Sequence, residues 1–536
     1  MLTSFNFDFG DRYIEVNDLP IAFRVYSESN VYTPHPERIQ IRQVPGAIEI
    51  EADGFAWAGL QQVCAGSFCA SIRFIENGFD CEIKATLSER IKGTALLILT
   101  TPPVSMPTAE YQFKPLCAMN AQLHYPEEMR VPVFPLLMGS GRYLGISSLD
   151  TKVRGKTLAV ASAPRDKKQK CCIELHHHED ARCWSHFQRS PVWRITDTVD
   201  PQPLFDERVR IADEEWKVLP WEEREDVPHW ARQIGLVLNL HGTHWTGYVF
   251  NTYQQQLDAL RYVGERIDGK RVLAFLAAWD GRYNYNWPQY QSDDAMGGAD
   301  GLKRLVDGAH ELGIHVIPQL GAVSANRRFL PPALHAATAQ DAYGNDIVKQ
   351  IDWDFDRTPD TYRVNANIGH PGFRQFLFDQ TCRLVEEFGF DGVFLDINMH
   401  HANDSRFNIL EGHIEYARMC HERFDNFLLF GEHWYDGLLQ AYPLVHSINE
   451  QGKGVPLRWP ECFERYARAT YHLIHPAPGT GSTGVYEAGY HQPFVPDPNF
   501  PAIPAISFVN DTLSKYCDEV DMRISAGKCY IERMNI

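Results

Sequence analysis

The sequence lacks several features that would place it at once in a broad class of proteins. No run of about eighteen apolar residues occurs, so we expect no membrane-spanning helix. The first residues, MLTSFNFDFGDRYIEV, do not combine a basic segment with an apolar core, so no secretory signal is expected and a cytoplasmic location is predicted. Basic residues are in the minority. The formal charge of −18 repels phosphate over most of the surface and disfavours nucleic-acid binding.

Cysteines with the paired spacing of a metal site are also absent. The 12 cysteines are spread along the chain, and we interpret them as reduced thiols in the core. His176, His177 and His178 are consecutive in a strand-like segment, where successive side chains point to opposite faces. Three such histidines cannot converge on one ion, so we expect no metal site and no cofactor.

The composition is that of an ordinary globular protein, with 44% apolar and 22% charged residues. A chain of 536 residues is long enough for roughly two or three domains. Residues 1–222 contain short segments of near-alternating polarity, such as RIQIRQVPGAIEIEADG, and turn signals such as ENGFD. No convincing long amphipathic helix is found there. We therefore predict an antiparallel β-sandwich domain over residues 1–222.

The pattern changes after a charged connector at 213–233 that contains tryptophan and proline. Apolar strand-like segments then alternate with helix-like segments, which implies right-handed parallel crossovers. This predicts a (β/α)8 TIM barrel over residues 223–536, with a long insertion at 323–368 that shapes the site. The eight expected strands are 234–242, 271–281, 314–322, 390–398, 426–434, 442–448, 470–476 and 505–511.

Polar and aromatic side chains collect where these expected strands end. The carboxyl ends of barrel strands share one face, and catalytic residues lie there. Asp396 ends the fourth strand, Glu432 lies in the fifth and Asp511 ends the eighth. Aromatic rings beside carboxylates are typical of sugar-binding sites, and two carboxyl groups are what glycosyl transfer needs. The candidate substrate-binding residues are His241, His244, Trp245, Trp279, Asp280, Trp287, Asn326, Arg327, Trp353, Asn398, His400, His433, Trp434, His446 and Asn510.

Three motifs resemble those of a known family. GFDGVFLD ending at Asp396, FLLFGEHWYDG carrying Glu432 and FVND ending at Asp511 resemble the ordered strand motifs of the α-amylase superfamily and related retaining α-glycosidases. The resemblance implies that Asp396 is the nucleophile, Glu432 the acid/base and Asp511 an auxiliary carboxylate that holds ring hydroxyls. The superfamily usually has arginine two residues before the nucleophile, and this chain has Phe394 there.

The function predicted from these observations is hydrolysis of glycosidic bonds, with α-linked ones expected as substrates, carbohydrate as the partner and the oligomeric state open. Two alternatives remain. The first is a barrel that binds carbohydrate without catalysing a reaction. The second is a metal-dependent hydrolase in which His241 and His244 hold the ion, although such sites usually need a further ligand from a later strand.

Overall fold

The structure is a computed structural model of the chain, and it divides into two compact units. The first unit comprises Met1–Lys217 together with Asn403–Arg406, and the second comprises Val218–Ala402 and Phe407–Ile536. The division after Lys217 falls five residues before the boundary proposed from the sequence. The residues described are 2–4, 12–57, 60–107, 113–115, 121–162, 170–244, 247–282, 285–351, 357, 361–448, 461–472, 502–509 and 512–536.

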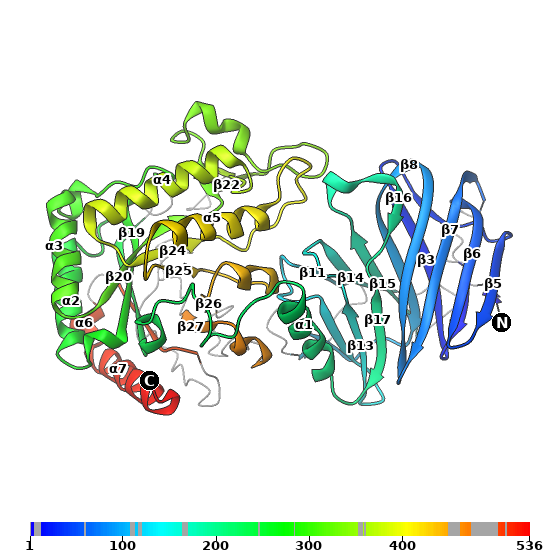
Figure 1. Cartoon of the computed structure of the whole chain (residues 1–536), viewed down its shortest axis with the longest axis horizontal. Helices are drawn as coiled ribbons and strands as arrows, with labels where there is room; N and C mark the ends of the chain where they lie inside the picture. Colours follow the sequence, from blue (N-terminus) through cyan, green and yellow to red (C-terminus); the bar gives the residue numbers. More distant parts are fainter. Residues whose placement is uncertain are drawn as a thin grey trace. The chain divides into compact units, whose positions relative to one another are not determined.

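The first unit is built on antiparallel strands (Figure 1), as the alternating polarity of its sequence predicts. The longest strand, β8, has 23 residues and pairs with β3, β7, β15, β16 and β17. Among the described residues 17 strands join one sheet. They are β1 (Leu2–Ser4), β2 (Arg12–Val16), β3 (Leu19–Ser27), β4 (Val31–Pro34), β5 (Ile39–Val44), β6 (Ala47–Trp57), β7 (Gln62–Ile75), β8 (Gly78–Thr100), β9 (Ser105–Pro107), β10 (Phe113–Pro115), β11 (Ala121–Tyr125), β12 (Val133–Leu137), β13 (Tyr143–Ser148), β14 (Lys156–Ser162), β15 (Cys171–His178), β16 (Ser185–Arg189) and β17 (Trp193–Thr198).

One helix in this unit corrects the sequence analysis, which expected none. Helix α1 spans Gln202–Glu214 and buries Leu204, Phe205, Arg208 and Ile211. Its apolar stripe contains few residues and is interrupted by a buried arginine, whose guanidinium donates to the carbonyls of Ser148 and Asp150. A helix whose buried face includes a hydrogen-bonded arginine is hard to recognise from hydrophobic periodicity.

The histidine run lies in β15, and its side chains alternate as a strand requires. The rings of His176 and His178 lie 3.9 Å apart between centroids. His177 is fully buried next to Glu179.

The second unit is built on eight parallel strands in the order β27-β26-β25-β24-β20-β19-β18-β28, counted over the described residues. A parallel bridge between Thr470 and Ile503 links the two end strands, so the sheet nearly closes on itself. All eight strands lie within or next to the segments expected from the sequence. They are β18 (Leu236–Thr243), β19 (Val272–Arg282), β20 (His315–Gly321), β24 (Gly392–Asp396), β25 (Leu428–Gly431), β26 (Leu444–Ile448), β27 (Arg468–His472) and β28 (Ala505–Phe508).

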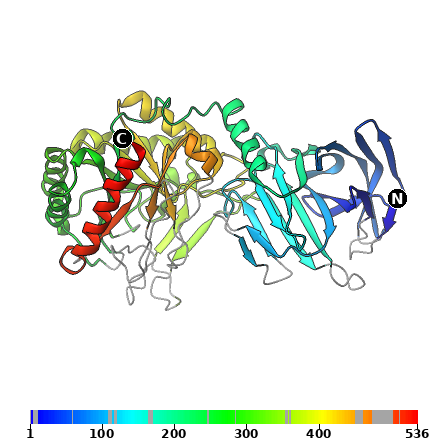
Figure 2. The ribbon, with the colours of Figure 1, turned by 90° about the horizontal axis from the view of Figure 1, so that it is seen from below.

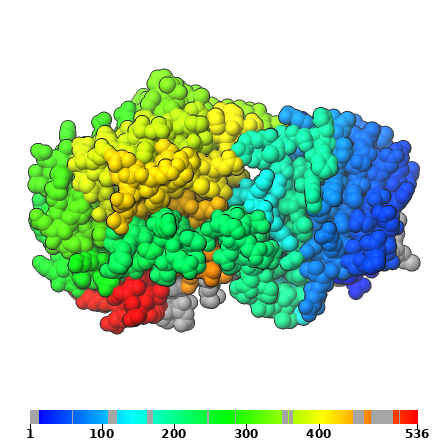
Figure 3. Space-filling view, in the orientation of Figure 1, coloured from blue at the N-terminus to red at the C-terminus, as the bar shows by residue number. Residues whose placement is uncertain are grey.

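Helices cover the outside of this sheet (Figures 1 and 2). Helix α7 contacts β18 and β28, and the side chains of α4 and α5 fill one side of the unit (Figure 3). The insertion at 323–368 forms a small sheet of β21 (Ser324–Asn326), β22 (Val348–Ile351) and β23 (Thr361–Asn365). The helices are α2 (Tyr253–Gly264), α3 (Gly298–Glu311), α4 (Pro371–Phe388), α5 (Ile409–Arg423), α6 (Thr512–Lys515) and α7 (Cys517–Met534). None of the helices in the described ranges has the length and apolar character needed to span a bilayer.

Aromatic rings from β19, β24, β25 and β26 pack together inside the sheet. The ring centroids of Phe275 and Phe394 lie 4.6 Å apart, those of Phe394 and Phe430 lie 4.9 Å apart, and those of Phe430 and His446 lie 4.7 Å apart. Side chains two residues apart on a strand share a face. The ring of Phe394 therefore lies below Asp396, one step nearer the amino end of β24.

Candidate active site

Asp396 and Glu432 lie side by side because their strands are neighbours in the sheet. Asp396 is the last residue of β24, Glu432 directly follows β25, and the two strands pair in parallel from Gly392 opposite Leu428 to Leu395 opposite Gly431. Asp396 is 1% exposed and Glu432 is 8% exposed. The Glu432 carboxyl group is close enough to Asp396 to raise the pKa of Asp396. The structure thus brings together two acids that are 36 residues apart in the sequence.

The backbone that follows Asp396 holds the Glu432 carboxyl group in place. The amide of Ile397 donates to Oε2 of Glu432 over 2.7 Å. Ile397 has a φ of 58°, in the left-handed region that is unusual for a β-branched residue. Such a conformation costs on the order of 1–3 kcal/mol and persists only where the surrounding structure imposes it. In this conformation the amide of Ile397 points at Glu432, one of the two catalytic candidates.

Asn398 holds the backbone of His433, the residue that follows Glu432. Its Nδ2 donates to the carbonyl of His433 over 2.9 Å, and its Oδ1 accepts from the amide of His433 over 2.7 Å. Asn398 is completely buried. A Cβ at Gly431 would come within 2.4 Å of Asn398 Nδ2, so glycine leaves the room for this side chain. Asn398 was predicted as a substrate ligand; both ends of its amide are bonded to the His433 backbone, and contact with a substrate stays a prediction.

The electrostatics of the pair favour one shared proton. Burial raises the pKa of Asp396 well above its ordinary value, and the adjacent Glu432 carboxylate raises it further. The positive charge of Arg363 opposes this rise in the pKa of Asp396. Nε2 of His433 lies 3.3 Å from Oε2 of Glu432. Two neighbouring carboxylates at a buried site repel each other, so ionisation of Asp396 beside Glu432 is disfavoured.

Arg363 comes from the insertion rather than from a barrel strand. It lies on β23, is 9% exposed, and its Nε donates to the Ser324 hydroxyl of β21 over 2.7 Å. On the same strand, Nδ2 of Asn365 lies 2.8 Å from Nε2 of His400, which the sequence analysis had proposed as a site residue. The small sheet therefore delivers polar groups to the carboxyl end of β24. Arg363 belongs to the insertion that we expected to shape the site, and its proximity to Asp396 had no signal in the sequence.

Asp280 is a second buried acid, near the end of β19. It is 4% exposed, and its Oδ2 has no hydrogen-bond partner among the described residues. Burial raises the pKa of Asp280 well above its ordinary value, and the Trp287 side chain interacts with the carboxyl group. Trp287 lies against Gly321, where a Cβ would come within 2.3 Å of the indole ring. Glycine at 321 therefore allows the ring to close over the end of β20.

Several other candidates are engaged in packing. Trp279 is fully buried, and its indole donates to the Gln319 carbonyl over 3.0 Å. Trp434 packs on Phe463, with ring centroids 5.6 Å apart. His446 belongs to the layer of rings described above. These placements favour a supporting role for the three side chains, and direct contact with a substrate stays a prediction.

Two candidates in the insertion differ in their surroundings. Asn326 is 4% exposed, and its Nδ2 donates to the Tyr285 carbonyl over 2.9 Å. Its Oδ1 accepts from the Arg328 amide over 3.1 Å. Arg327 is half-exposed, with Nη1 3.6 Å from Oδ2 of Asp346. Asn326 therefore orders the loop, whereas Arg327 keeps a weak surface ion pair.

His241 and His244 follow the first barrel strand and are both buried. Burial lowers the pKa of His244 to about 4, so its ring is neutral near pH 7. Both rings pack edge-on against Phe250, with centroids 5.8 and 5.3 Å away. Within the described ranges, no group of three or more His, Cys, Asp or Glu residues is arranged to hold a metal ion. Trp245, Trp353, Asn510 and Asp511 lie outside the described residues.

The comparisons with known proteins agree on the fold. No protein-family model and no curated protein matches the sequence. The ligand-free α-N-acetylgalactosaminidase NagBb from Bifidobacterium bifidum is similar in structure with a TM-score of 0.65, at 12% identity, over 98% of this chain and 92% of that chain. An α-galactosidase from Lactobacillus brevis gives 0.53 at 11% identity, over 96% and 73%. The GH36 α-galactosidase AgaA from Geobacillus stearothermophilus gives 0.51 at 11% identity, over 99% and 76%.

These neighbours support the broader part of the resemblance seen in the sequence. All three are named as glycosidases of α-linked galactose or N-acetylgalactosamine. They share with this chain the combination of a β-rich unit and a parallel, nearly closed eight-stranded sheet. None of them bears specifically on the α-amylase superfamily, to which the motifs were compared.

Proposed function

We propose that this protein is a retaining glycoside hydrolase that acts on α-linked galactose or N-acetylgalactosamine, with a (β/α)8 barrel as its catalytic domain. The observation that carries the proposal is the position of two buried acids, Asp396 and Glu432, at the ends of directly paired strands. The choice of sugar rests on the neighbours named above, and the choice of mechanism rests on the geometry of the pair. Inverting enzymes keep their carboxyl groups about 6.5–9.5 Å apart to admit a water molecule, whereas two acids at the ends of directly paired strands suit the closer spacing of retaining enzymes, roughly 5 Å.

The reaction uses the single proton of the pair. An oxygen of Asp396 attacks the anomeric carbon while Glu432 donates its proton to the glycosidic oxygen, and the bond to the leaving group breaks. A covalent ester between the sugar and Asp396 results. Glu432, now ionised, takes a proton from a water molecule whose oxygen attacks the same carbon. Hydrolysis frees Asp396 and returns the proton to Glu432.

The difference in burial supports this division of roles. The nucleophile needs contact only with the sugar, whereas the acid/base must serve a departing group and then a water molecule. Asp396 is the more deeply buried of the two and has the guanidinium of Arg363 nearby to stabilise its ionised form. Glu432 is the more exposed and receives the Ile397 amide. The proposed cycle requires Asp396 to be ionised and Glu432 to carry the proton once a substrate lies between the two groups.

The test is a screen of the purified chain against α- and β-linked aryl glycosides, with Asp396→Asn and Glu432→Gln alongside. We expect turnover of α-galactosides or α-N-acetylgalactosaminides, release of the α-anomer first by NMR, and loss of turnover in Asp396→Asn. In Glu432→Gln, substrates with good leaving groups should be spared relative to natural glycosides, because they need little protonation.

Contrary results have clear meanings. Sparing of good leaving groups in Asp396→Asn rather than in Glu432→Gln would exchange the two roles. Release of the β-anomer first would overturn retention. Loss of activity on chelation would favour the metal-dependent alternative, and binding of sugars without any turnover would favour the non-catalytic one.

A further inference from the structure

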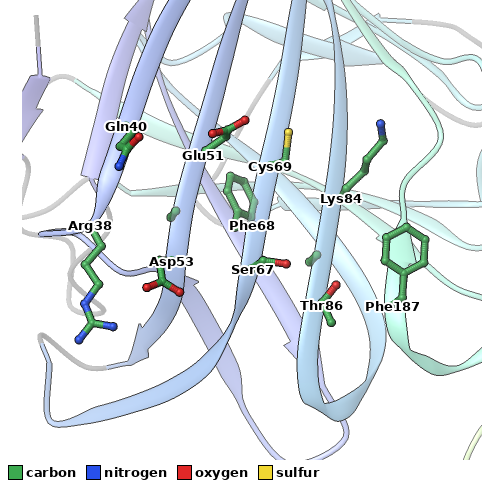
Figure 4. Close-up of a pocket in the computed structure, with 12 residues that line it drawn as sticks. Arg38, Gln40, Glu51, Asp53, Ser67, Phe68, Cys69, Lys84, Thr86 and Phe187 are labelled. Carbon is green, nitrogen blue, oxygen red and sulfur yellow. The ribbon is translucent and has the colours of Figure 1, made fainter.

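We infer that the first unit carries a second sugar-binding site, a groove on its sheet that accepts a neutral oligosaccharide. The groove has a volume of about 380 Å³ and lies across strands β5, β6, β7, β8 and β16 (Figure 4). It is formed entirely by residues of the first unit, so it is separate from the Asp396–Glu432 pair. The inference goes beyond the proposed hydrolysis and does not depend on it.

The sequence of side chains across the strands creates the depression. One row runs Asp53, Ser67, Thr86 and Phe187, in which each residue is the cross-strand partner of the next. The short side chains of Ser67 and Thr86 form the floor of the groove, and the ring of Phe187 stands at one end (Figure 4). A sheet face with small residues between large ones is hollow at its centre.

A second, parallel row supplies longer polar groups. Gln40, Glu51, Cys69 and Lys84 are cross-strand partners in that order, and the first row lies two residues farther along the same strands. Four inter-strand spacings of about 4.8 Å separate β5 from β16, which gives a length of roughly 19 Å. The groove is therefore long enough for a short oligosaccharide rather than a single sugar ring.

The chemistry of the lining selects a neutral, hydroxyl-rich ligand. Arg38 and Lys84 are balanced by Glu51 and Asp53, so neither a polyanion nor a polycation is favoured. Over the described part of the chain, the Arg38 guanidinium and the Asp53 carboxylate have no ion-pair partner and stay available to hydroxyl groups. A floor of hydroxyl-bearing side chains disfavours an apolar peptide.

Phe187 provides the remaining element of sugar recognition. Its side chain is 54% exposed at the edge of the groove, although burying a phenyl ring is strongly favourable. The C–H face of a sugar ring can cover such a ring while its hydroxyls bond to the neighbouring polar groups. An exposed ring beside balanced charges and hydroxyls is the combination that a neutral sugar chain satisfies as a whole.

The experiment measures binding without turnover. The full-length Asp396→Asn chain is applied to an array of neutral, sialylated and sulfated oligosaccharides, and the tightest neutral binder is then titrated by calorimetry. We expect Phe187→Ala in this background to lower the association constant roughly five- to tenfold, as expected for loss of one stacked ring. Phe74→Ala is the matched control, because Phe74 is another exposed phenylalanine of this sheet and does not line the groove.

Each outcome decides the inference separately from the proposed catalysis. In the otherwise unchanged chain, Phe187→Ala should leave the turnover of a small aryl glycoside as it is. Phe187-dependent binding in a chain that hydrolyses nothing would support the groove while refuting the proposed function. Binding that Phe187→Ala does not change, binding of charged glycans alone, or no binding of any neutral oligosaccharide would overturn the inference.

Discussion

Replacement of Asn398 by alanine tests whether one buried amide holds the catalytic pair in register. The change removes the donor to the His433 carbonyl and the acceptor for the His433 amide, both at a position with no exposure. A buried backbone group left without a partner costs about 1–3 kcal/mol. With two such groups, and some relief from water entering the space of the lost side chain, we expect the free energy of unfolding to fall by about 2–4 kcal/mol.

The effect on activity should be larger than the effect on substrate binding. His433 directly follows Glu432, so releasing the His433 backbone lets the carboxyl group shift, and a displacement of about 1 Å can lower the rate roughly a hundredfold. Urea denaturation and steady-state kinetics on an aryl α-glycoside measure the two effects. Asn345→Ala, at an exposed asparagine, is the control and should change the free energy of unfolding by less than about 0.5 kcal/mol. Wild-type stability and wild-type kcat in Asn398→Ala would refute the reasoning.

Two further predictions concern residues that support the barrel. Gly321→Ala should lower the free energy of unfolding by about 1–3 kcal/mol, because the new Cβ would lie 2.3 Å from the Trp287 ring. Gly139→Ala is the control and should have little effect, because the space around Gly139 is open. Equal stability of the two variants in urea would contradict this packing. The hydrogen bond from His310 to Asp391 raises the pKa of His310, so its stabilisation is fully present below the unfolded pKa of about 6.5 and is lost as the pH rises through the folded value. His310→Gln should therefore lower the melting temperature more at pH 5.5 than at pH 8.5, and an equal change at both would show that the ion pair contributes nothing.

Much of the barrel could be predicted because its strands carry their own signals. A fully buried parallel strand is a short apolar run between turn residues, as in the segment from Gly392 to Asp396. Chain order then fixes which strand ends become neighbours, so the adjacency of Asp396 and Glu432 followed from topology. The proximity of Asp396 and Glu432 could therefore be predicted without any knowledge of side-chain packing.

The groups that organise the pair could not be predicted in this way. The Ile397 amide acts through a backbone conformation that an isoleucine rarely adopts, and no sequence pattern reports it. Arg363 reaches Asp396 from a small sheet within an insertion, whose fold depends on pairings between distant segments. The α-amylase pattern places an arginine where this chain has Phe394. The structure puts Phe394 into the interior layer of rings and brings a guanidinium to Asp396 from β23 instead.

The layer of rings below the pair also restricts how protons travel. Phe394 and Phe430 lie one step beneath Asp396 and Glu432 on their own strands, and Phe275 and His446 close the layer beside them. Three of the four rings are phenyl groups, which cannot form the hydrogen bonds along which a proton moves. In the proposed cycle, the proton that leaves with the departing alcohol is therefore replaced by the attacking water, on the side of the pair away from the rings. Product exit, water entry and recovery of the proton would then share that side, and each turnover would use it in sequence.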